Sequence, residues 1–450
     1  MKTPDTTLVN ILVTTGLGSS IISWGNMGDV AMLQAGLAHL AKLWPEAKLN
    51  VITEWPEKLH QFCPEAIPIP AAGRKLWIGD TLLLGRFAGF LPSPIKNFAI
   101  KWKKRAAFRY PAILRWYLVG RLRMRNRKAE IEAMSSFSET LAAADLVVAC
   151  GAGGFYDGCR DWNLDTLDTI EAAVIRGIPV AMFGQHFGPL TDPLVLGRAK
   201  SVLPAVNTIT LRGNRGSQSL LESLGVPAAC IHVTGDEATD LAYDARPIKL
   251  GTDLGVNFRL RTSAETTDDD IEVLRPILHR FAAEHRVSLI PAPIAVDSFT
   301  SDHNAIKRLM HGYDDLTDGG AHLAAPLDVI RQVGRCRVLV TCAYHAAVFA
   351  MAQGIPVVAL VKSSYFAEKF LGLQERFGLG CKIVYLNRPE VAKNFHDALE
   401  RVWQTADEMH IPLQQAAIQH IQLNSIAYDQ VMELANNRRH SNSHFRSQSE

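Results

Sequence analysis

The sequence predicts an α/β protein made of two similar domains, each built on a parallel β-sheet. Short apolar segments typical of buried strands alternate with amphipathic segments of helical length, which is the pattern of parallel sheets. This alternation starts again near residue 250, and the stretches 170–183 and 345–360 share one order of helix, glycine, Ile-Pro-Val and strand. We therefore expect two Rossmann-like domains, at 1–245 and 246–430, joined in the loop at 244–253.

The N-terminal domain opens with a strand–helix–strand unit. A continuous apolar run predicts a first strand at 8–15, a helical period predicts a helix at 29–44, and a second strand follows at 49–55. The same reasoning predicts the later strands and helices of this domain at 145–150, 163–176, 178–183, 208–212, 217–225 and 231–236.

The C-terminal domain repeats the alternation of strands and helices. Its expected elements lie at 254–260, 268–285, 287–294, 325–336, 337–342 and 355–361, with a short helix after His345. Gly354 suits the left-handed residue that ends such a helix, and Pro356 suits the first residue of a strand. The polar residues 431–450 are expected to form a disordered tail.

Residues 73–130 interrupt the pattern and predict a basic helical insertion. They hold 15 Lys or Arg residues against Asp80 and Glu130, and nine aromatic residues are interleaved with these charges. One interpretation is a helical insertion with a solvated basic face. The other is a surface that binds an anionic membrane. Nucleic acid is not expected as a partner, because no nucleic-acid fold signature accompanies the charge.

Composition limits the class of protein further. Hydrophobic residues make up 48% of the 450 residues, charged residues 20%, and the net charge is +2, which indicates a globular chain. The seven cysteines form no C-x-x-C pair and no metal-like spacing with histidine, so we expect reduced thiols and no metal. No signal peptide or run of about 18–20 apolar residues is evident. We expect a cytoplasmic protein, at most peripheral at the inner face of the plasma membrane.

Glycine-rich loops follow three of the expected strands, at 16–29, 151–158 and 184–190. Ligands bind outside the carboxyl ends of the strands in an open α/β sheet, where glycines and helix N-termini let backbone N–H groups approach an anion. The first loop begins "GLGSSI" and lacks the third glycine of a dinucleotide fingerprint, which argues against a nicotinamide cofactor. These loops are either simple turns or one anion site, whose candidate binding residues are Asn26, Gly153, Gly154 and His186.

Arg212 and His345 occupy equivalent places in the two halves, each between a strand and the following helix. A guanidinium at Arg212 would grip a carboxylate or phosphate, unless it is simply a surface arginine at a strand end. The imidazole of His345 lies at a helix N-terminus, where it would contact a phosphate or act as a general acid. The alternative is a hydrogen-bonded structural histidine.

Six segments in this order resemble the polysaccharide pyruvyl transferase family: "GNMGDVAML", "ADLVVACGAGGF", "RGIPVAMFGQHFGPL", "TLRGNRGSQSLLESLG", "GDEATDLA" and "TCAYHAAVFAMAQGIPVVAL". They span nearly the whole chain except the basic insertion and the tail. The resemblance implies a GT-B-like fold with two Rossmann-like domains facing a cleft, the N-terminal domain on the acceptor side and the C-terminal domain on the donor side. It also implies an enzyme that transfers pyruvate from phosphoenolpyruvate to a sugar of a polysaccharide or lipid-linked precursor, forming a ketal without a cofactor.

The resemblance also assigns residues. Arg212 matches the family arginine that engages the donor, and His345 matches the histidine of an Arg-x-His motif that contacts the donor phosphate. The arginine of that motif is replaced by Ala343, so another cation is needed, and Arg259, Lys362 or Lys369 could supply it. Candidate acceptor-side groups are Asp29, Asp236 and His186, with Asp29 and His345 as the expected catalytic residues, although Asp29 could instead cap its helix.

The missing arginine keeps two other functions open. A GT-B glycosyltransferase would place the diphosphate of a nucleotide sugar at the same helix N-termini. A non-catalytic relative would only bind a glycan.

Overall fold

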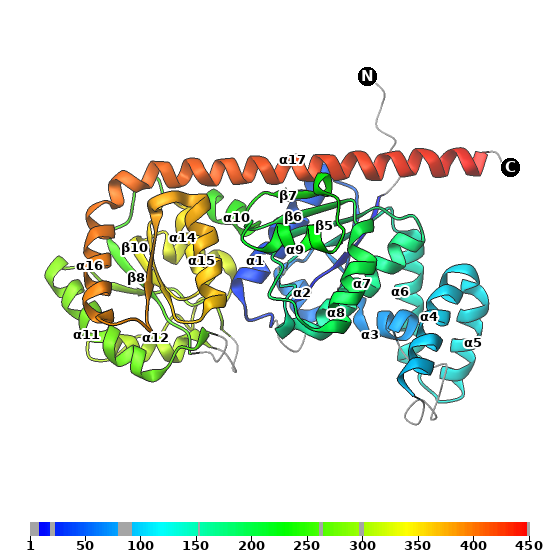
Figure 1. Ribbon diagram of the computed structural model, residues 1–450, viewed down its shortest axis with the longest axis horizontal. Helices are drawn as coiled ribbons and strands as arrows, with labels where there is room; N and C mark the ends of the chain where they lie inside the picture. The colour runs from blue at the N-terminus through cyan, green and yellow to red at the C-terminus, as the bar shows by residue number, and fades with distance from the viewer. Residues whose placement is uncertain are drawn as a thin grey trace, which may run out of the picture.

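The computed structural model describes residues 9–18, 23–79, 92–151, 154–260, 264–296 and 301–447. It contains two parallel sheets, each covered by helices, and one long C-terminal helix that runs across both (Figure 1). The two-domain α/β fold predicted from the alternation of strands and helices is confirmed.

The first sheet has seven parallel strands in the order β3-β2-β1-β4-β5-β6-β7. Its strands are β1 (Asn10–Thr14), β2 (Lys48–Thr53), β3 (Ile67–Pro70), β4 (Leu146–Ala149), β5 (Val180–Gln185), β6 (Thr208–Leu211) and β7 (Ile231–Val233). The central strands β1 and β4 are nearly all apolar and buried, as a sheet covered on both faces requires. The order reverses between β1 and β4, so the sheet has its switch point there.

The helices of this domain cover the two faces of the sheet. They are α1 (Met27–Leu43), α2 (Pro56–Phe62), α7 (Arg160–Ile175), α8 (Pro193–Val202), α9 (Ser217–Ser223) and α10 (Ala238–Asp244). The basic insertion is helical as expected and contains α3 (Ala71–Arg74), α4 (Ser93–Arg109) and α5 (Pro111–Arg123), with α6 (Lys128–Ala143) leading back to the sheet. In Figure 1, α4 and α5 project from the end of the molecule farthest from the second sheet.

The second sheet has five parallel strands in the order β12-β11-β10-β8-β9. Its strands are β8 (Asp253–Asn257), β9 (Leu289–Pro291), β10 (Cys336–Thr341), β11 (Val357–Val361) and β12 (Cys381–Tyr385). The helices around it are α11 (Asp268–His285), α12 (Asp302–Met310), α13 (Pro326–Val333), α14 (Tyr344–Ala352), α15 (Ser364–Phe377) and α16 (Val391–Gln404). Among the helices described in both domains, none is long and apolar enough to cross a membrane.

The expectation of a disordered tail at 431–450 is wrong for the residues that the structure describes. Helix α17 (Ala406–Ser447) continues through this segment. A buried stripe on one side of α17 explains the order, because its members recur every three or four residues: Leu413, Ala417, His420, Asn424, Ala427, Tyr428, Val431 and Ala435. Helix α17 packs against α10, α14 and α1, and it therefore ties the two domains together.

Candidate functional site

A buried cluster of three charged or titratable side chains lies where the two domains meet. Arg212 directly follows β6, Asp236 follows β7, and His345 lies in the first turn of α14 in the other domain. Nη1 of Arg212 is 3.3 Å from Oδ2 of Asp236 and 3.3 Å from Nε2 of His345. The same Nε2 is 3.6 Å from Oδ2 of Asp236. The structure therefore brings together the two residues that the sequence singled out as donor contacts.

The charges in this cluster stabilise one another. Burial by itself would raise the pKa of Asp236, but the imidazole of His345, the guanidinium of Arg212 and the backbone N–H of Ala238 outweigh it and lower the pKa to about 2. Burial also works against the charge of Arg212, yet Asp236 raises its pKa above the ordinary value. Both groups are therefore ionised at neutral pH. Nε2 of His345 accepts from Arg212 and lies near the carboxylate of Asp236, so the imidazole contacts both charged groups.

A small pocket opens beside this cluster between the two domains. Its walls are His186, Arg212, Gly213 and Arg215 from the N-terminal domain and Tyr344, Glu368, Lys369 and Gly372 from the C-terminal domain. The guanidinium of Arg212 lies 5.1 Å from the ring centre of Tyr344, and Nζ of Lys369 lies 4.3 Å from that of Tyr365. Three cations from the two domains therefore line the pocket with one carboxylate, Glu368, and this excess of positive charge favours an anionic ligand, although Asp236 already pairs with Arg212.

His186 belongs to the same pocket wall. Burial, followed by the positive charges of Lys369 and Arg212, lowers its pKa well below the usual value. The neutral ring is a hydrogen-bonding group rather than a further cation. Gly154 adjoins it, because Phe155 N–H donates to the carbonyl of His186 at 3.0 Å. Gly153, the other glycine predicted from this loop, lies outside the described residues.

The N-terminus of α1 fits directly against His345. Asn26 is its N-cap, and Oδ1 of Asn26 accepts from the N–H of Gly28 at 3.2 Å. A Cβ atom at Gly28 would lie 2.0 Å from Cγ of His345, so no side chain larger than hydrogen fits there without displacing the imidazole. Helix α1 is also anchored to the other domain, since Met27 N–H donates to the carbonyl of Ile294 at 2.8 Å.

Asp29 lies in the first turn of α1 and is buried. The alternative that Asp29 caps its helix is wrong, because Asn26 fills that place and the amide of Asn26 donates to the carboxylate of Asp29. Burial opposes the charges of Arg212 and Arg259, whereas Asp236 and Asp302 respectively raise their pKa values, and the negative charge of Asp29 adds a smaller effect at both. Asp29 is therefore a buried negative charge near both arginines.

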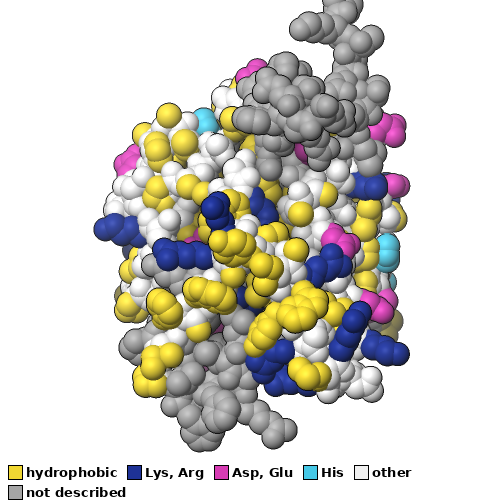
Figure 2. Space-filling model, turned by 90° about the vertical axis from the view of Figure 1, so that its right-hand side faces the viewer, with side chains coloured by type: hydrophobic (Ala, Val, Ile, Leu, Met, Phe, Trp, Pro, Cys, Tyr) yellow, Lys and Arg dark blue, Asp and Glu magenta, His cyan; other side chains and the backbone are white. Residues whose placement is uncertain are grey.

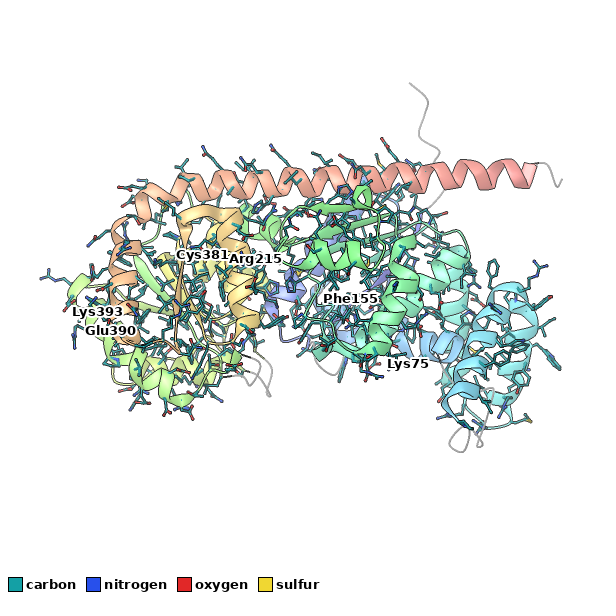
Figure 3. All side chains as sticks on the ribbon, in the orientation of Figure 1. Lys75, Phe155, Arg215, Cys381, Glu390 and Lys393 are labelled. Atoms are coloured by element: carbon teal, nitrogen blue, oxygen red, sulfur yellow. The ribbon has the colours of Figure 1, made fainter. Side chains whose placement is uncertain are left out.

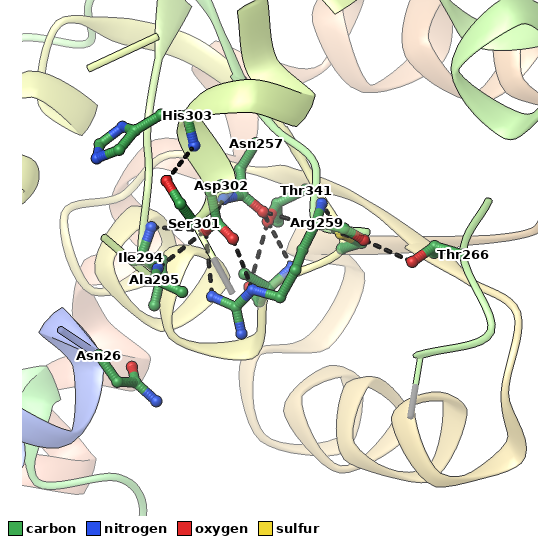
Figure 4. Close-up of polar contacts among 12 residues, drawn as sticks. Asn26, Asn257, Arg259, Thr266, Ile294, Ala295, Ser301, Asp302, His303 and Thr341 are labelled. Atoms are coloured by element: carbon green, nitrogen blue, oxygen red, sulfur yellow. Dashed lines mark hydrogen bonds and ion pairs between the residues drawn. The ribbon is translucent and has the colours of Figure 1, made fainter. Parts of the chain in front are cut away.

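Arg259, one of the cations proposed to replace the missing motif arginine, is held in a buried ion pair (Figure 4). Its Nε and Nη2 atoms donate to the two carboxylate oxygens of Asp302 at 2.6 and 3.1 Å. Asn257 of β8 pairs with Thr341 of β10, so Arg259 follows its strand at the same sheet edge as Ala343. Lys362, another of these cations, is 3.0 Å from Asp270 and does not line the interdomain pocket. Of the three, Lys369 reaches the pocket.

Sequence reasoning missed the aromatic walls and the bridge across the pocket. The sequence holds only two hints of these residues: Tyr344 is next to His345, and Tyr365 lies one helical turn before Lys369. Arg215, labelled in Figure 3, lies in the pocket wall and pairs across the domains with Glu368, at 2.7 Å, and with Glu375.

A second, larger pocket lies in the N-terminal domain alone, at the carboxyl ends of β1, β2 and β3. It encloses about 290 Å³. Its polar lining includes Glu54, Arg74, Lys75, Asp161 and Asp165, with Trp162 as an aromatic wall. Arg74 is buried and pairs with Asp165, while Lys75 pairs with Glu54 at 3.1 Å. Carboxylates beside an indole are suited to hydroxyl-rich ligands.

Solved structures share the arrangement of both domains. A Listeria monocytogenes protein described as a UDP-N-acetylglucosamine 2-epimerase superposes with a TM-score of 0.51 at 13% identity, covering 91% of this chain and 94% of its own. The UDP-GlcNAc 2-epimerase of Neisseria meningitidis gives 0.49 at 12% identity, covering 92% and 99%. The Listeria likeness shows the fold, which is GT-B-like with two Rossmann-like domains.

Comparison of sequences identifies the family. The search of curated protein sequences gave no match. The family model for polysaccharide pyruvyl transferase matches residues 26–364, a range that begins at the cap of α1 and includes Arg212, Asp236, His345 and their surroundings. The chain belongs to the polysaccharide pyruvyl transferase family.

Proposed function

We propose that this transferase moves the pyruvyl group of phosphoenolpyruvate onto two hydroxyls of a sugar, in a polysaccharide or its lipid-linked precursor. The products are a cyclic ketal and inorganic phosphate. The observation that carries the proposal is the buried cluster of Arg212, Asp236 and His345 beside a pocket that Lys369 enters from the opposite domain. Membership of the family supports the same reaction.

The charges of the pocket match the donor. Phosphoenolpyruvate carries a carboxylate and a phosphate close together, and Arg212 and Lys369 provide two cations for them. Neutral His186 offers a hydrogen bond from the same wall. The N-termini of α1 and α14 meet beside His345, where the positive ends of the two helix dipoles favour an anion. Arg259 remains a predicted donor contact, although Asp302 already engages it.

The reaction requires a proton donor and a proton acceptor. A sugar hydroxyl attacks C2 of phosphoenolpyruvate and loses its proton, while C3 takes up a proton and becomes a methyl group. Phosphate then leaves with the C2–O bond electrons, and the second hydroxyl adds to C2 and loses its proton. We assign protonation at C3 to His345, because its imidazole lies beside the pocket, 3.3 Å from Arg212 and 3.6 Å from Asp236. We assign the acceptance of a hydroxyl proton to Asp29.

The acceptor sugar is proposed to bind in the pocket at the ends of β1, β2 and β3. Glu54, Asp161 and Asp165 would accept hydrogen bonds from hydroxyls, and Trp162 would contact a sugar face. Among the described residues, no group of three or more His, Cys, Asp or Glu side chains could hold a metal ion.

Phosphate release and ligand-induced stabilisation test the proposal. Phosphoenolpyruvate at millimolar concentration should raise the melting temperature, and phosphate should appear when a glycan acceptor is added. His345→Asn should abolish phosphate release while the protein stays folded. Arg212→Lys keeps a positive charge beside Asp236 but removes the guanidinium that would bind phosphoenolpyruvate through two hydrogen bonds. This variant should therefore bind phosphoenolpyruvate more weakly. Wild-type turnover in either variant would show that this is the wrong site.

A glycosyltransferase is the second candidate, and Ala343 is the observation that favours it. Without the motif arginine, the N-terminus of α14 would still accept the diphosphate of a nucleotide sugar. The two candidates differ in which ligand stabilises the protein. Stabilisation by a nucleotide sugar, with no effect of millimolar phosphoenolpyruvate, would replace the first proposal by the second.

A further inference from the structure

Helix α4 carries an exposed stripe that changes from apolar to basic along its length. The stripe contains Ile95, Phe98, Trp102, Arg105 and Arg109, which recur every three or four residues and so lie on one helix face. Phe98 is 71% exposed and Trp102 is 56% exposed. Burial of Lys103, Ala106 and Ala107 shows that other faces of the helix pack inward. The aromatic residues of the stripe therefore do not serve the core.

Helix α5 presents a second stripe of the same kind. Ile113 and Trp116 lie on it, followed by Arg123 and Met124 at its end, while Leu114, Leu118 and Leu122 are buried on the opposite side. Trp116 is 78% exposed and Met124 is 82% exposed. Figure 2 looks onto this end of the molecule, where hydrophobic side chains gather with lysines and arginines beside them.

The basic residues of this hairpin divide into two groups. Some hold it to the domain: Lys103 donates from Nζ to the carbonyl of Leu76 at 2.6 Å, and Arg115 pairs with Glu139. Others, including Arg105, Arg109 and Arg123, are exposed. The sequence has no acidic residue between Asp80 and Glu130, so the outer face carries a positive charge that nothing within the hairpin offsets.

We propose that the outer face of α4 and α5 docks on a membrane surface that contains anionic lipids. Exposed Trp, Phe and Ile side chains would enter the interface between headgroups and acyl chains, and the arginines would pair with lipid phosphates. The hairpin lies at the far end of the N-terminal domain, away from the second sheet, so docking would leave the interdomain pocket uncovered (Figure 1). The inference is independent of which donor the enzyme uses.

Membrane lipid fits this face better than other partners. A basic face that is only solvated does not explain several large apolar side chains that are more than half exposed, because exposed apolar patches mark interaction sites. A second copy of this chain would bring two positively charged faces together. Single-stranded nucleic acid would pair with the charges and stack on the aromatic rings, but the isoleucines and Met124 would make no favourable contact with it.

Vesicle binding by the full chain tests the proposal. Wild-type protein should sediment with vesicles of phosphatidylcholine and phosphatidylglycerol, bind pure phosphatidylcholine far more weakly, and lose affinity as salt rises. Trp102→Ser with Trp116→Ser should reduce the affinity by about ten-fold or more. Arg105→Gln with Arg109→Gln should reduce it by about five-fold for each arginine removed. The matched control is Ile248→Ser with Leu316→Ser, because these apolar residues are 98% and 96% exposed elsewhere and should not affect binding.

Several outcomes would overturn the inference. These are absence of wild-type binding to the anionic vesicles at low salt, equal binding by the tryptophan variant, and equal loss in the control variant. Binding of a short RNA that the tryptophan substitutions abolish, without vesicle binding, would assign the face to nucleic acid. Self-association that the same substitutions abolish, again without vesicle binding, would assign it to a second copy. Circular dichroism of each variant should match the wild-type spectrum, as expected when the chain keeps its overall helix content.

Discussion

Replacement of Gly28 by alanine tests the closest approach between the two domains. Gly28 lies in the first turn of α1, and the imidazole of His345 comes from the first turn of α14. A methyl group at position 28 would be 2.0 Å from Cγ and 2.1 Å from Nδ1 of His345. Ordinary contact between such atoms begins near 3.4 Å, so the imidazole or α1 must move by about 1.4 Å.

The displacement should lower both the rate of turnover and the stability of the fold. A misplacement of about 1 Å in a catalytic constellation costs roughly 100-fold in rate, so Gly28→Ala should lower kcat at least that much. Overpacking a filled site also costs about 1–3 kcal/mol in the free energy of unfolding. The loss of rate should exceed what partial unfolding explains, because the protein remains folded at the assay temperature.

Phosphate release and thermal unfolding measure the two effects separately. Gly197→Ala is the matched control, because this exposed residue of α8 has no described atom within 4 Å of its added Cβ. The control should keep full turnover and gain slightly in stability, as glycine to alanine changes in exposed helices do. Normal kcat in Gly28→Ala would refute the argument that the imidazole position matters for turnover. Normal stability would refute the close approach itself.

Three further predictions concern the surrounding charges. Burial raises the pKa of Glu237 to about 8, so the folded state keeps this proton, and the free energy of unfolding should fall by several kcal/mol from pH 5 to pH 8. Denaturant titrations of Glu237→Gln should lack this pH dependence, and an equal pH dependence in the variant and the wild type would contradict the prediction. The pKa of Asp236 is lowered to about 2, so about 2 kcal/mol of stability should be present above pH 4 and lost as the pH falls to 2. Asp236→Asn should reduce this loss of stability at acidic pH, and an unchanged loss would refute the lowered pKa. Arg215→Ala should lower the free energy of unfolding by at most about 1 kcal/mol, because its two ion pairs are partly exposed, and this loss should vanish in 1 M salt. A larger loss of stability that does not depend on salt would mean that Arg215 does more than bridge the domains.

Most of the fold was predictable because its strands carry strong local signals. Continuous apolar runs such as those of β1 and β10 identify strands buried on both faces without further context. The edge strands β3 and β12 do not stand out in the sequence, because prolines in β3 and the exposed Lys382 in β12 interrupt the apolar pattern. The polar sequence of residues 431–447 predicts no helix, because, among the side chains that the structure describes, the buried ones that pack α17 against the domains extend only to Ala435.

The candidate site was predictable in part. The rule that ligands bind at carboxyl ends of strands selected Arg212 and His345, and the structure places them 3.3 Å apart. Asp236 obeys the same rule, but it was taken as an acceptor-side group because no sequence pattern shows which loops of two separate sheets face each other. The closeness of Gly28 to His345 was invisible for the same reason, since 317 residues separate the two positions.

Ala343 stands where the resemblance to the family predicts an arginine, so the positions of the other cations matter. Arg259 follows the neighbouring strand at the same sheet edge, yet Asp302 already engages it. Arg212 and Lys369 line the interdomain pocket, and they come from different domains. A donor held by these two charges gains its full electrostatic stabilisation only when the domains are together, as they are in this structure. We therefore expect donor binding at this pocket to depend on the contact between α1 and α14, which Gly28 makes possible.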